Sequence, residues 1–334
     1  MSVASASSPA WRSRLVVGGA ALCALGAGAA ALWWRRRLRV RISRLCVYPI
    51  KSCRGHSLTV CAMSVAGLAH DREYAVVRLR DQGAAASAMT QRDMPLLATI
   101  APDMPTTEGL VVRKMGMRLL VVPLKLDGTT YDMDCCSWGK GDIAKGVDQG
   151  DEAAAWLCEA LGETGLRLVR FTGGRSTPKP EKYGDGRTLF SDGFSMLLTS
   201  EASLADLSAS TGLDRFCERM RPNVVVDGCG AYEEDSWHSL SWQHRHASAS
   251  LRLPKPCARC TIPRVDPETG TRGPDPIAKI KSYRSGRAMQ HKRLQHKKHY
   301  EEHQGEIFFG QNVNIDCTSE VVLRVGDVLE PARS

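Results

Sequence analysis

Apolar and polar residues alternate along several short stretches of this chain, and the alternation predicts β-strands. Residues 41–50 alternate in this way and reach Pro49, as a strand does where it runs into a turn. Residues 321–329 predict a final hairpin around Gly326-Asp327. The other candidate strands, several of them separated by glycine-containing turns, cover residues 58–65, 72–79, 109–113, 117–123, 166–171 and 222–226.

Helical patterns are fewer than strand patterns. One helix is predicted to begin at a capping Asp151, and its apolar face consists of Trp156, Leu157, Ala160 and Leu161. A second, shorter helix is predicted after Ser200, which can cap it, with Leu204 and Leu207 as apolar positions. Many short strands and few helices favour an α+β, mainly β fold built on barrels, and disfavour a doubly wound parallel sheet.

Two stretches lack either periodicity. Residues 173–188 consist of turn-forming and charged residues and are the best candidate for a linker between two domains. Residues 285–304 collect lysine, arginine and histidine in one polar stretch, which predicts either a solvated helix or a mobile loop. His296, His299 and His303 within it could share one helical face.

The amino-terminal region contains a candidate membrane anchor. Leu15 to Trp34 is free of charged residues, and twenty residues at about 1.5 Å rise match the thickness of a bilayer core. Five arginines follow this segment and two precede it, which predicts that the body of the protein stays in the cytosol. A cleaved signal peptide is the competing interpretation. The moderate hydrophobicity and the arginines on both sides favour an anchor in the mitochondrial outer membrane.

Charge and cysteine content narrow the picture further. The net charge of +9 comes largely from seven arginines in residues 1–41, and the rest holds 38 basic against 36 acidic residues. A nearly neutral body gives no case for nucleic-acid binding. The twelve cysteines have no framework spacing and are typical of reduced thiols in the cytosol. No sequence motif for a nicotinamide dinucleotide or a nucleoside triphosphate is present.

Cys257 and Cys260 form the most distinctive chemical motif of the chain. Arg259 stands directly beside Cys260, and a nearby cation favours the thiolate, the form of cysteine that binds soft metals and attacks electrophiles. The turn-forming sequence D-P-E-T-G follows at residues 266–270. From the residues alone, three interpretations stay open: a functional thiolate, half of a structural zinc site, and inert cysteines or a disulfide.

Four motifs in order resemble those of MOSC proteins that carry an amino-terminal barrel domain. The resemblance covers residues 44–330. Together with the arginine-flanked apolar segment, it makes the chain similar to the amidoxime-reducing components, molybdenum enzymes of the outer mitochondrial membrane. The motifs are V-Y-P-I-K-S-C-R-G at 47–55, D-R-E-Y at 71–74, M-R-P-N-V-V-V at 220–226 and C-A-R-C-T-I-P-R-V-D-P-E-T-G at 257–270.

The resemblance implies a domain order and a cofactor. We expect a tail at 1–14, a transmembrane anchor at 15–34, an N-terminal β-barrel domain at 44–172 and a MOSC β-barrel domain at 187–331 packed on it. The cofactor would be molybdenum held by a pterin dithiolene, with Cys260 as its protein ligand and as the catalytic residue. The implied cofactor-binding residues are Lys51, Ser52, Arg72, Asp192, Gly193, Phe194, Arg221, Asn223, Ala258, Arg259 and Cys260.

The implied activity is reduction of N-hydroxylated compounds (amidoximes, hydroxylamines, N-oxides and nitrite). Electrons would come from another protein, because the chain offers no nicotinamide or flavin motif of its own, and the resemblance implies cytochrome b5 and NADH-cytochrome b5 reductase as the donors. A MOSC carrier module that binds molybdenum cofactor or sulfur for delivery is the alternative, and a zinc-stabilised membrane adaptor is a third. The chain departs from the family pattern at Ala258, where serine is common, and at Asn312, where an aromatic residue is common.

Overall fold

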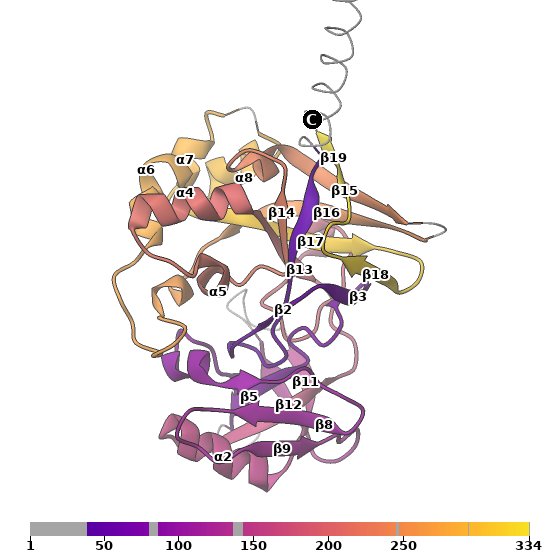
Figure 1. The fold of residues 1–334 in the computed structure, drawn as a ribbon, viewed down its shortest axis with the longest axis vertical. Helices are drawn as coiled ribbons and strands as arrows, with labels where there is room; N and C mark the ends of the chain where they lie inside the picture. The colour runs from indigo at the N-terminus through magenta and orange to yellow at the C-terminus, as the bar shows by residue number, and fades with distance from the viewer. Residues whose placement is uncertain (1–38, 80–85, 136–142, 245–246, 293, 334) are drawn as a thin grey trace, which may run out of the picture. The chain divides into compact units, whose positions relative to one another are not determined.

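Strands dominate the fold, and helices are the minority, as the alternation of apolar and polar residues predicts (Figure 1). The structure is a computed structural model, which describes residues 39–79, 86–135, 143–244, 247–292 and 294–333. The described residues from Val40 onward belong to one compact unit. The predicted anchor at residues 15–34 lies outside the described residues, and no helix within them is long and apolar enough to cross a membrane.

The strands of the first half are short. They are β1 (Arg41–Val47), β2 (His56–Leu58), β3 (Val60–Ser64), β4 (Gly67–Leu68), β5 (Tyr74–Arg78), β6 (Ala86–Ala88), β7 (Ala101–Pro102), β8 (Gly109–Arg113), β9 (Leu120–Pro123), β10 (Thr130–Asp134), β11 (Ile143–Asp148) and β12 (Leu166–Thr172). The second half contains β13 (Met196–Ser200), β14 (Val224–Asp227), β15 (Trp237–His244), β16 (Ala247–Ala258), β17 (Phe308–Asp316), β18 (Val321–Arg324) and β19 (Glu330–Arg333).

Most helices are one or two turns long. The α-helices are α2 (Asp151–Leu161), α3 (Pro180–Tyr183), α4 (Glu201–Thr211), α5 (Phe216–Met220), α6 (Lys281–Arg284), α7 (Gly286–Met289) and α8 (Lys297–Glu302). Short 3-10 turns occupy Pro95–Thr99, Glu233–Ser236, Ile262–Arg264 and Ile277–Ile280.

Two larger sheets organise these strands. Strands β10-β11-β12-β5-β6 close into a barrel in the amino-terminal half, and the carboxy-terminal half has an eight-stranded sheet in the order β19-β15-β16-β17-β13-β14-β1-β2. The prediction of a mainly β fold with a barrel is therefore confirmed. In the eight-stranded sheet, the segment that leads into β19 also joins β1, because Ile42 N–H donates to the carbonyl of Asp327 and Leu329 N–H donates to that of Val40, both at 2.9 Å.

The two halves of the chain are interlaced at this large sheet. The indigo strand β1 pairs antiparallel with the orange β14, so an amino-terminal segment completes the carboxy-terminal sheet (Figure 1). In the same way β18 pairs with β3. Leu45 and Val47 of β1 are buried in one core with Leu198, Val224 and Leu251. The motif that follows β1 is therefore held against the second half of the chain.

Two predictions need correction, one on the start of a helix and one on the pairing of strands. Asp151 is the first residue of α2, and Gly150, with φ 104°, is its N-cap. By contrast Ser200 caps α4 as predicted, because its Oγ accepts the backbone N–H of Ser203 at 3.1 Å. Residues 321–329 do not form a hairpin, since β18 pairs with β3 while β19 pairs with β15. Turn residues predict that a chain reverses, but they do not determine which strand it then pairs with.

The stretch 285–304 is neither a solvated helix nor an open loop. It contains α7 and α8, and Met289 and Tyr300 within it are fully buried with Phe308. Arg284, directly before it, is also fully buried, and its guanidinium forms a two-point ion pair with Asp235 (3.1 Å from Nη2 to Oδ1). The polar composition of this segment did not predict its burial, because only a few apolar residues and one buried arginine pack it against the core.

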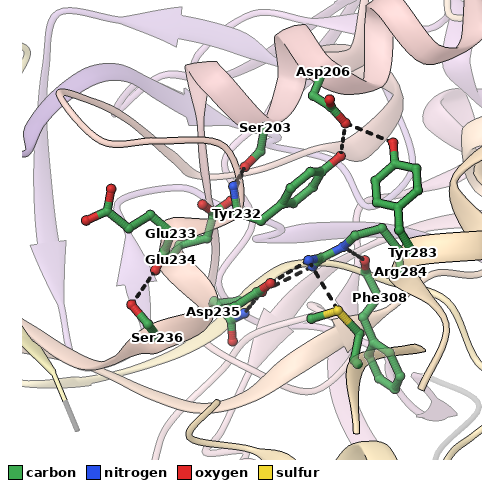
Figure 2. A network of polar contacts seen from close by, with 12 residues as sticks. Ser203, Asp206, Tyr232, Glu233, Glu234, Asp235, Ser236, Tyr283, Arg284 and Phe308 are labelled. Atoms are coloured by element: carbon green, nitrogen blue, oxygen red, sulfur yellow. Dashed lines mark hydrogen bonds and ion pairs between the residues drawn. The ribbon is translucent and has the colours of Figure 1, made fainter. Parts of the chain in front are cut away.

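Figure 2 shows the network around this buried ion pair. Arg284 Nε donates to the carbonyl of Phe308 at 3.0 Å, and the guanidinium lies 4.1 Å from the centre of the Tyr232 ring. The hydroxyls of Tyr232 and Tyr283 both donate to Asp206, at 2.6 Å and 2.8 Å. These contacts join α4, α6 and β17, so the helical segment is tied to the large sheet by polar groups.

The predicted linker at 173–188 is packed against the rest of the protein. Arg175, Thr177 and Thr188 within it are buried. Arg175 Nη1 donates to the carbonyls of Leu189 and Ser191 at 2.8 Å and 2.6 Å. The segment therefore leads directly into the loop at residues 189–194, which contributes to the cavity described next.

Candidate active site

One cavity of about 310 Å³ collects every residue that the sequence analysis assigned to cofactor binding. Its walls also contain residues that were not assigned to cofactor binding from the sequence. The predicted residues that line it are Lys51, Ser52, Arg72, Asp192, Gly193, Phe194, Arg221, Asn223, Ala258, Arg259 and Cys260. The added ones include Arg92, Met196, Met220, Cys257, Ile262 and Asn312. The two positions that depart from the family pattern, Ala258 and Asn312, thus both face this cavity.

The cavity lies between the two halves of the chain. Lys51 and Ser52 follow β1, which the carboxy-terminal sheet holds in place. Arg221 and Asn223 stand between α5 and β14, and Cys257 and Ala258 end the long strand β16. Residues far apart in the sequence therefore meet because β1, β14 and β16 belong to one sheet.

Three residues of the cavity wall have unusual backbone conformations. Ser52, Arg72 and Arg221 have φ angles of 67°, 50° and 59°. Residues other than glycine rarely adopt this left-handed region of backbone conformation, which costs about 1–3 kcal/mol for each residue. Such conformations concentrate at binding sites, where the surrounding structure holds a side chain in a required direction.

Arg72 and Arg221 form a rigid cationic pair around Tyr48. Their guanidinium carbons lie 4.3 Å and 4.2 Å from the centre of the Tyr48 ring. Arg72 Nη1 donates to both carboxylate oxygens of Asp71 and to Asn223 Oδ1 at 3.0 Å. Arg221 Nη1 donates to the carbonyl of Cys53 at 2.7 Å. Both side chains are therefore fixed before any ligand arrives.

Arg221 also retains an unused donor. Its Nη2 is buried and has no hydrogen-bond partner among the described residues. Burial, with the neighbouring charge of Arg72, lowers the pKa of Arg221 to about 10. A buried N–H without a partner costs free energy, so this atom favours an anionic acceptor in the cavity.

Lys51 and Arg92 lie at the cavity wall on either carboxylate oxygen of Asp192. Lys51 Nζ donates to Asp192 Oδ1 and to the carbonyl of Phe190, the latter at 2.8 Å. Arg92 Nη2 lies 3.6 Å from Asp192 Oδ2. Burial opposes ionisation of Asp192, but the charges of Lys51 and Arg92 outweigh it and hold the pKa of this carboxyl below its ordinary value. Asp192 thus positions two cations at the cavity wall.

The cation next to Cys260 is not the one that the sequence indicated. Arg259 Nη1 donates to Cys257 Sγ at 3.3 Å, and its Nη2 donates to the carbonyl of Met220 at 2.9 Å. Burial disfavours the charged form of Arg92, yet the charge of Asp192 and the contact with Cys260 outweigh this and raise the pKa of Arg92. Arg92 therefore faces Cys260, whereas Arg259 turns back toward Cys257. Sequence neighbours on an extended segment point to different sides, which explains the error.

This difference predicts a separable effect on the two thiols. Arg92→Met should slow alkylation of Cys260 by iodoacetamide several-fold near neutral pH, because it removes a positive charge beside the reacting sulfur. Arg259→Met should slow alkylation of Cys257 instead. The rates are measured by mass spectrometry of each cysteine in protein prepared without cofactor. Equal slowing of both thiols by either substitution would contradict the assignment.

The loop that presents Cys260 is tied down on its far side. Asp266 Oδ1 accepts the backbone N–H groups of Glu268 and Thr269, both at 3.0 Å, which confirms the predicted turn at 266–270. The buried Arg219 donates to the carbonyls of Pro263 and Val265 and to Asp266 Oδ2. Residues 260–266 are therefore fixed to α5, the helix that leads into Arg221.

The side chains of the cavity suit a ligand that carries both an anionic group and a soft metal. Five cations and one carboxylate line it, namely Lys51, Arg72, Arg92, Arg221, Arg259 and Asp192. The two thiols add sulfur ligands, which suit soft metals. Within the part of the chain that the structure describes, no group of three metal-binding side chains includes Cys257 or Cys260.

Arg92 is the residue that sequence reasoning missed. It stands in the loop Thr90-Gln91-Arg92-Asp93, where no periodicity or motif distinguishes it from a surface charge. Gln91 Nε2 donates to the carbonyl of Ser52 at 2.7 Å, which holds this loop against the turn after β1. Such long-range contacts, this one and the ion pair with Asp192, bring Arg92 to the cavity.

Comparison with known proteins places both halves of the chain in known domain families. The model of the MOSC N-terminal beta barrel domain matches residues 39–164, and that of the MOSC domain matches residues 185–330. Mitochondrial amidoxime reducing component 2 of Rattus norvegicus is 34% identical over 287 residues, with 79% of this chain and 81% of that protein covered. Mitochondrial amidoxime-reducing component 1 of Homo sapiens is 31% identical over 296 residues, with 83% of each chain covered.

A third relative shares only part of its length. Molybdenum cofactor sulfurase of Drosophila grimshawi is 32% identical over 257 residues, which cover 75% of this chain but 31% of that protein. The similarity to the amidoxime reducing components extends over most of both chains, and both domain models match in order. The chain therefore belongs to the MOSC-domain family that includes the mitochondrial amidoxime-reducing components.

Proposed function

We propose that this protein is a molybdenum-cofactor-dependent reductase of N-hydroxylated compounds: amidoximes, hydroxylamines, N-oxides and nitrite. The observation that supports this most directly is the cavity itself, where Cys260 and Cys257 share one wall with five cations. The names of the relatives, amidoxime reducing components and a molybdenum cofactor sulfurase, support the same cofactor.

The residues present fit such a cofactor. Its phosphate would accept hydrogen bonds from Arg221, whose Nη2 is buried and without a partner among the described residues, and from Lys51 and Arg72 nearby. Guanidinium groups suit phosphate because they offer two parallel donors. Ser52, Asn223 and the backbone of Gly193 and Ala258 would supply neutral contacts to the pterin. Asp192 and Phe194 would shape the wall beside it.

Cys260 would supply the protein sulfur ligand in this arrangement. When bound, the molybdenum centre supplies the two-electron chemistry that removes oxygen from nitrogen. The chain itself contributes a soft ligand, a cation at Arg92 beside it, and a tethered loop that holds the thiol in place. Arg259 donates its hydrogen bond to Cys257, and this contact leaves Cys260 for the metal.

Two measurements on one preparation test this proposal. Metal analysis of the purified protein should find molybdenum in preference to zinc, and the protein with its cofactor should reduce benzamidoxime with a chemical electron donor. Zinc in place of molybdenum would contradict the proposed cofactor. Bound molybdenum without turnover would favour the alternative, a MOSC carrier module that holds molybdenum cofactor or sulfur for delivery. The similarity to molybdenum cofactor sulfurase is the observation behind that alternative.

The phosphate contacts lead to a prediction about cofactor occupancy. Lys51→Ala and Arg221→Ala should each weaken cofactor binding by about 10- to 100-fold, since each removes a charge-assisted hydrogen bond. Turnover per bound molybdenum should change much less, because these contacts serve binding and not the reacting atoms. Molybdenum content and rate are measured on the same samples, with Arg118→Ala, an exposed arginine remote from the cavity, as control. Full occupancy with lost turnover would place these residues in the reaction.

The electron donors and the location belong to the same proposal. Cytochrome b5 and NADH-cytochrome b5 reductase would deliver the electrons at the mitochondrial outer membrane, with the catalytic part facing the cytosol. The names of these relatives, mitochondrial amidoxime-reducing components, support a mitochondrial location. The charge-free segment 15–34, flanked by arginines, supports a membrane anchor. An anchor would raise the effective concentration of the partners on one surface without a large interface.

Removal of the anchor tests the location. Deletion of residues 1–38 should leave turnover with a chemical reductant unchanged and slow turnover with membrane-bound cytochrome b5, because only co-localisation is lost. The deletion should stop there, since Val40 is buried in the core and its carbonyl accepts the N–H of Leu329 at 2.9 Å. Unchanged kinetics with the membrane-bound donor would show that the segment does not concentrate the partners.

A further inference from the structure

The short helix α8 and His303, the residue that caps its C-terminus, carry a cluster of metal-binding side chains that the proposed reaction does not use. His299, Glu302 and His303 each offer one ligand atom, and these atoms all lie within 4.8 Å of one another. Positions i, i+3 and i+4 share one face of a helix, so the spacing H-x-x-E-H brings the three groups together. The centres of the His299 and His303 rings are 4.4 Å apart.

The burial of His299 is the second observation. His299 is only 7% exposed, and neither of its ring nitrogens has a hydrogen-bond partner among the described residues. The ring packs edge-on against Tyr183 and Phe308, at 6.4 Å and 5.7 Å between centres. A buried imidazole normally donates from one nitrogen and accepts at the other. Two unused nitrogens next to a second histidine indicate a missing ligand.

The surroundings orient the other two groups. His303 Nδ1 lies 3.4 Å from Glu306 Oε1, and a carboxylate at one ring nitrogen is how metal-binding imidazoles are commonly positioned. Lys182 of α3 donates to Glu302 Oε2 at 2.8 Å, which leaves the other carboxylate oxygen for a cation. Glu302 and His303 are partly exposed, so an ion can enter from solvent while His299 closes the inner side.

We infer that His299, Glu302 and His303 form a binding site for a divalent transition metal, for which zinc is the fitting ion. Two imidazoles and one carboxylate are ligands that zinc accepts in tetrahedral sites, with water in the fourth position. None of the three residues lines the cavity of the proposed active site. The site is therefore separate from the thiols at 257 and 260, although Tyr183 and Phe194 lie between them in edge-on contact at 5.8 Å.

Such an ion would stabilise the segment that contains it. Helix α8 has only six residues, and helices of this length are not stable by themselves. A metal that binds the folded helix and not the unfolded chain adds its binding free energy to folding. The ion would thus hold α8 in its packed position above Phe308 and next to α3.

Cobalt(II) gives the sharpest test, because its absorption distinguishes nitrogen and oxygen ligands from thiolates. Titration of the full chain in mild detergent should produce visible d–d bands without the near-ultraviolet charge-transfer band of cobalt–sulfur bonds, and zinc should displace them. His303→Gln and His299→Gln should each weaken binding by about 10-fold or more, by analogy with the loss of groups that support a metal site. His291→Gln, an exposed histidine on the same segment, is the matched control.

A second readout covers variants that fold poorly. Zinc should raise the melting temperature of the unaltered protein and of His291→Gln but not of His303→Gln, in which only a partly exposed ring is changed. The inference is overturned if the cobalt bands are absent, if they persist in the double variant of His299 and His303, or if His291→Gln loses them equally. Bands dominated by sulfur charge transfer would instead assign the metal to the cysteines. Benzamidoxime turnover does not enter any of these outcomes.

Discussion

Cys260→Ser should abolish reduction of benzamidoxime, with a loss of at least about 1,000-fold in turnover, while the fold stays intact. The thiol lines the cavity, faces Arg92 and ends a loop that Arg219 holds through two carbonyls. A serine oxygen keeps the size of the side chain but is a hard ligand, which suits molybdenum less than thiolate does. Turnover with a chemical reductant, molybdenum content and circular dichroism are measured together.

Cys257→Ser is the matched control for that variant. Cys257 lines the same cavity, but its Sγ accepts a hydrogen bond from Arg259 at 3.3 Å. We expect this variant to retain substantial activity and full molybdenum content. If Cys257→Ser were inactive and Cys260→Ser active, the assignment of the metal ligand would be reversed.

Asp235→Ala should destabilise the folded protein by about 3–5 kcal/mol, because it leaves a buried arginine without its counter-charge. Arg284 and Asp235 (Figure 2) are 0% and 2% exposed, and Gln311 Nε2 also donates to Asp235, at 2.7 Å. No sequence pattern marks this pair, which is separated by 49 positions along the chain. Denaturant unfolding measured by tryptophan fluorescence gives the change.

Two further variants separate the buried charge from the packing. The double substitution Asp235→Leu with Arg284→Met should recover much of the lost stability, since apolar groups can replace a buried ion pair. Arg118→Ala breaks an ion pair whose side chains are 56% and 65% exposed, and it should have little effect. A loss after Asp235→Ala no larger than that of Arg118→Ala would show that the buried pair does not hold the helical segment.

Strand positions were largely predictable from sequence. The predicted stretches 109–113 and 166–171 correspond to β8 and β12, and 72–79 contains β5. Alternation identifies a strand because successive side chains point to opposite faces of a sheet. It does not identify the partner, which is why residues 321–329 were wrongly expected to pair with one another. The partners of β18 and β19 lie at β3 and β15, far away along the chain.

The composition of residues 285–304 misled for a related reason. A stretch rich in lysine, arginine and histidine predicts exposure, because isolated charges are expensive to bury. Met289 and Tyr300 nevertheless anchor it in the core, and Arg284 just before it is buried because Asp235 neutralises it. Whether a charged side chain can be buried depends on a partner that the local sequence does not contain.

The sequence by itself determined the family motifs, and through them the set of residues that meet in one cavity. Residues such as Lys51, Arg221 and Cys260 could be predicted together because each motif is local. Only the tertiary structure decided which cation faces which thiol. Arg259 is adjacent to Cys260 in the chain but donates to Cys257, while Arg92 reaches Cys260 from a distant loop. Electrostatic effects depend on distance through space, and that distance is set by the packing of β1, β14 and β16 in one sheet.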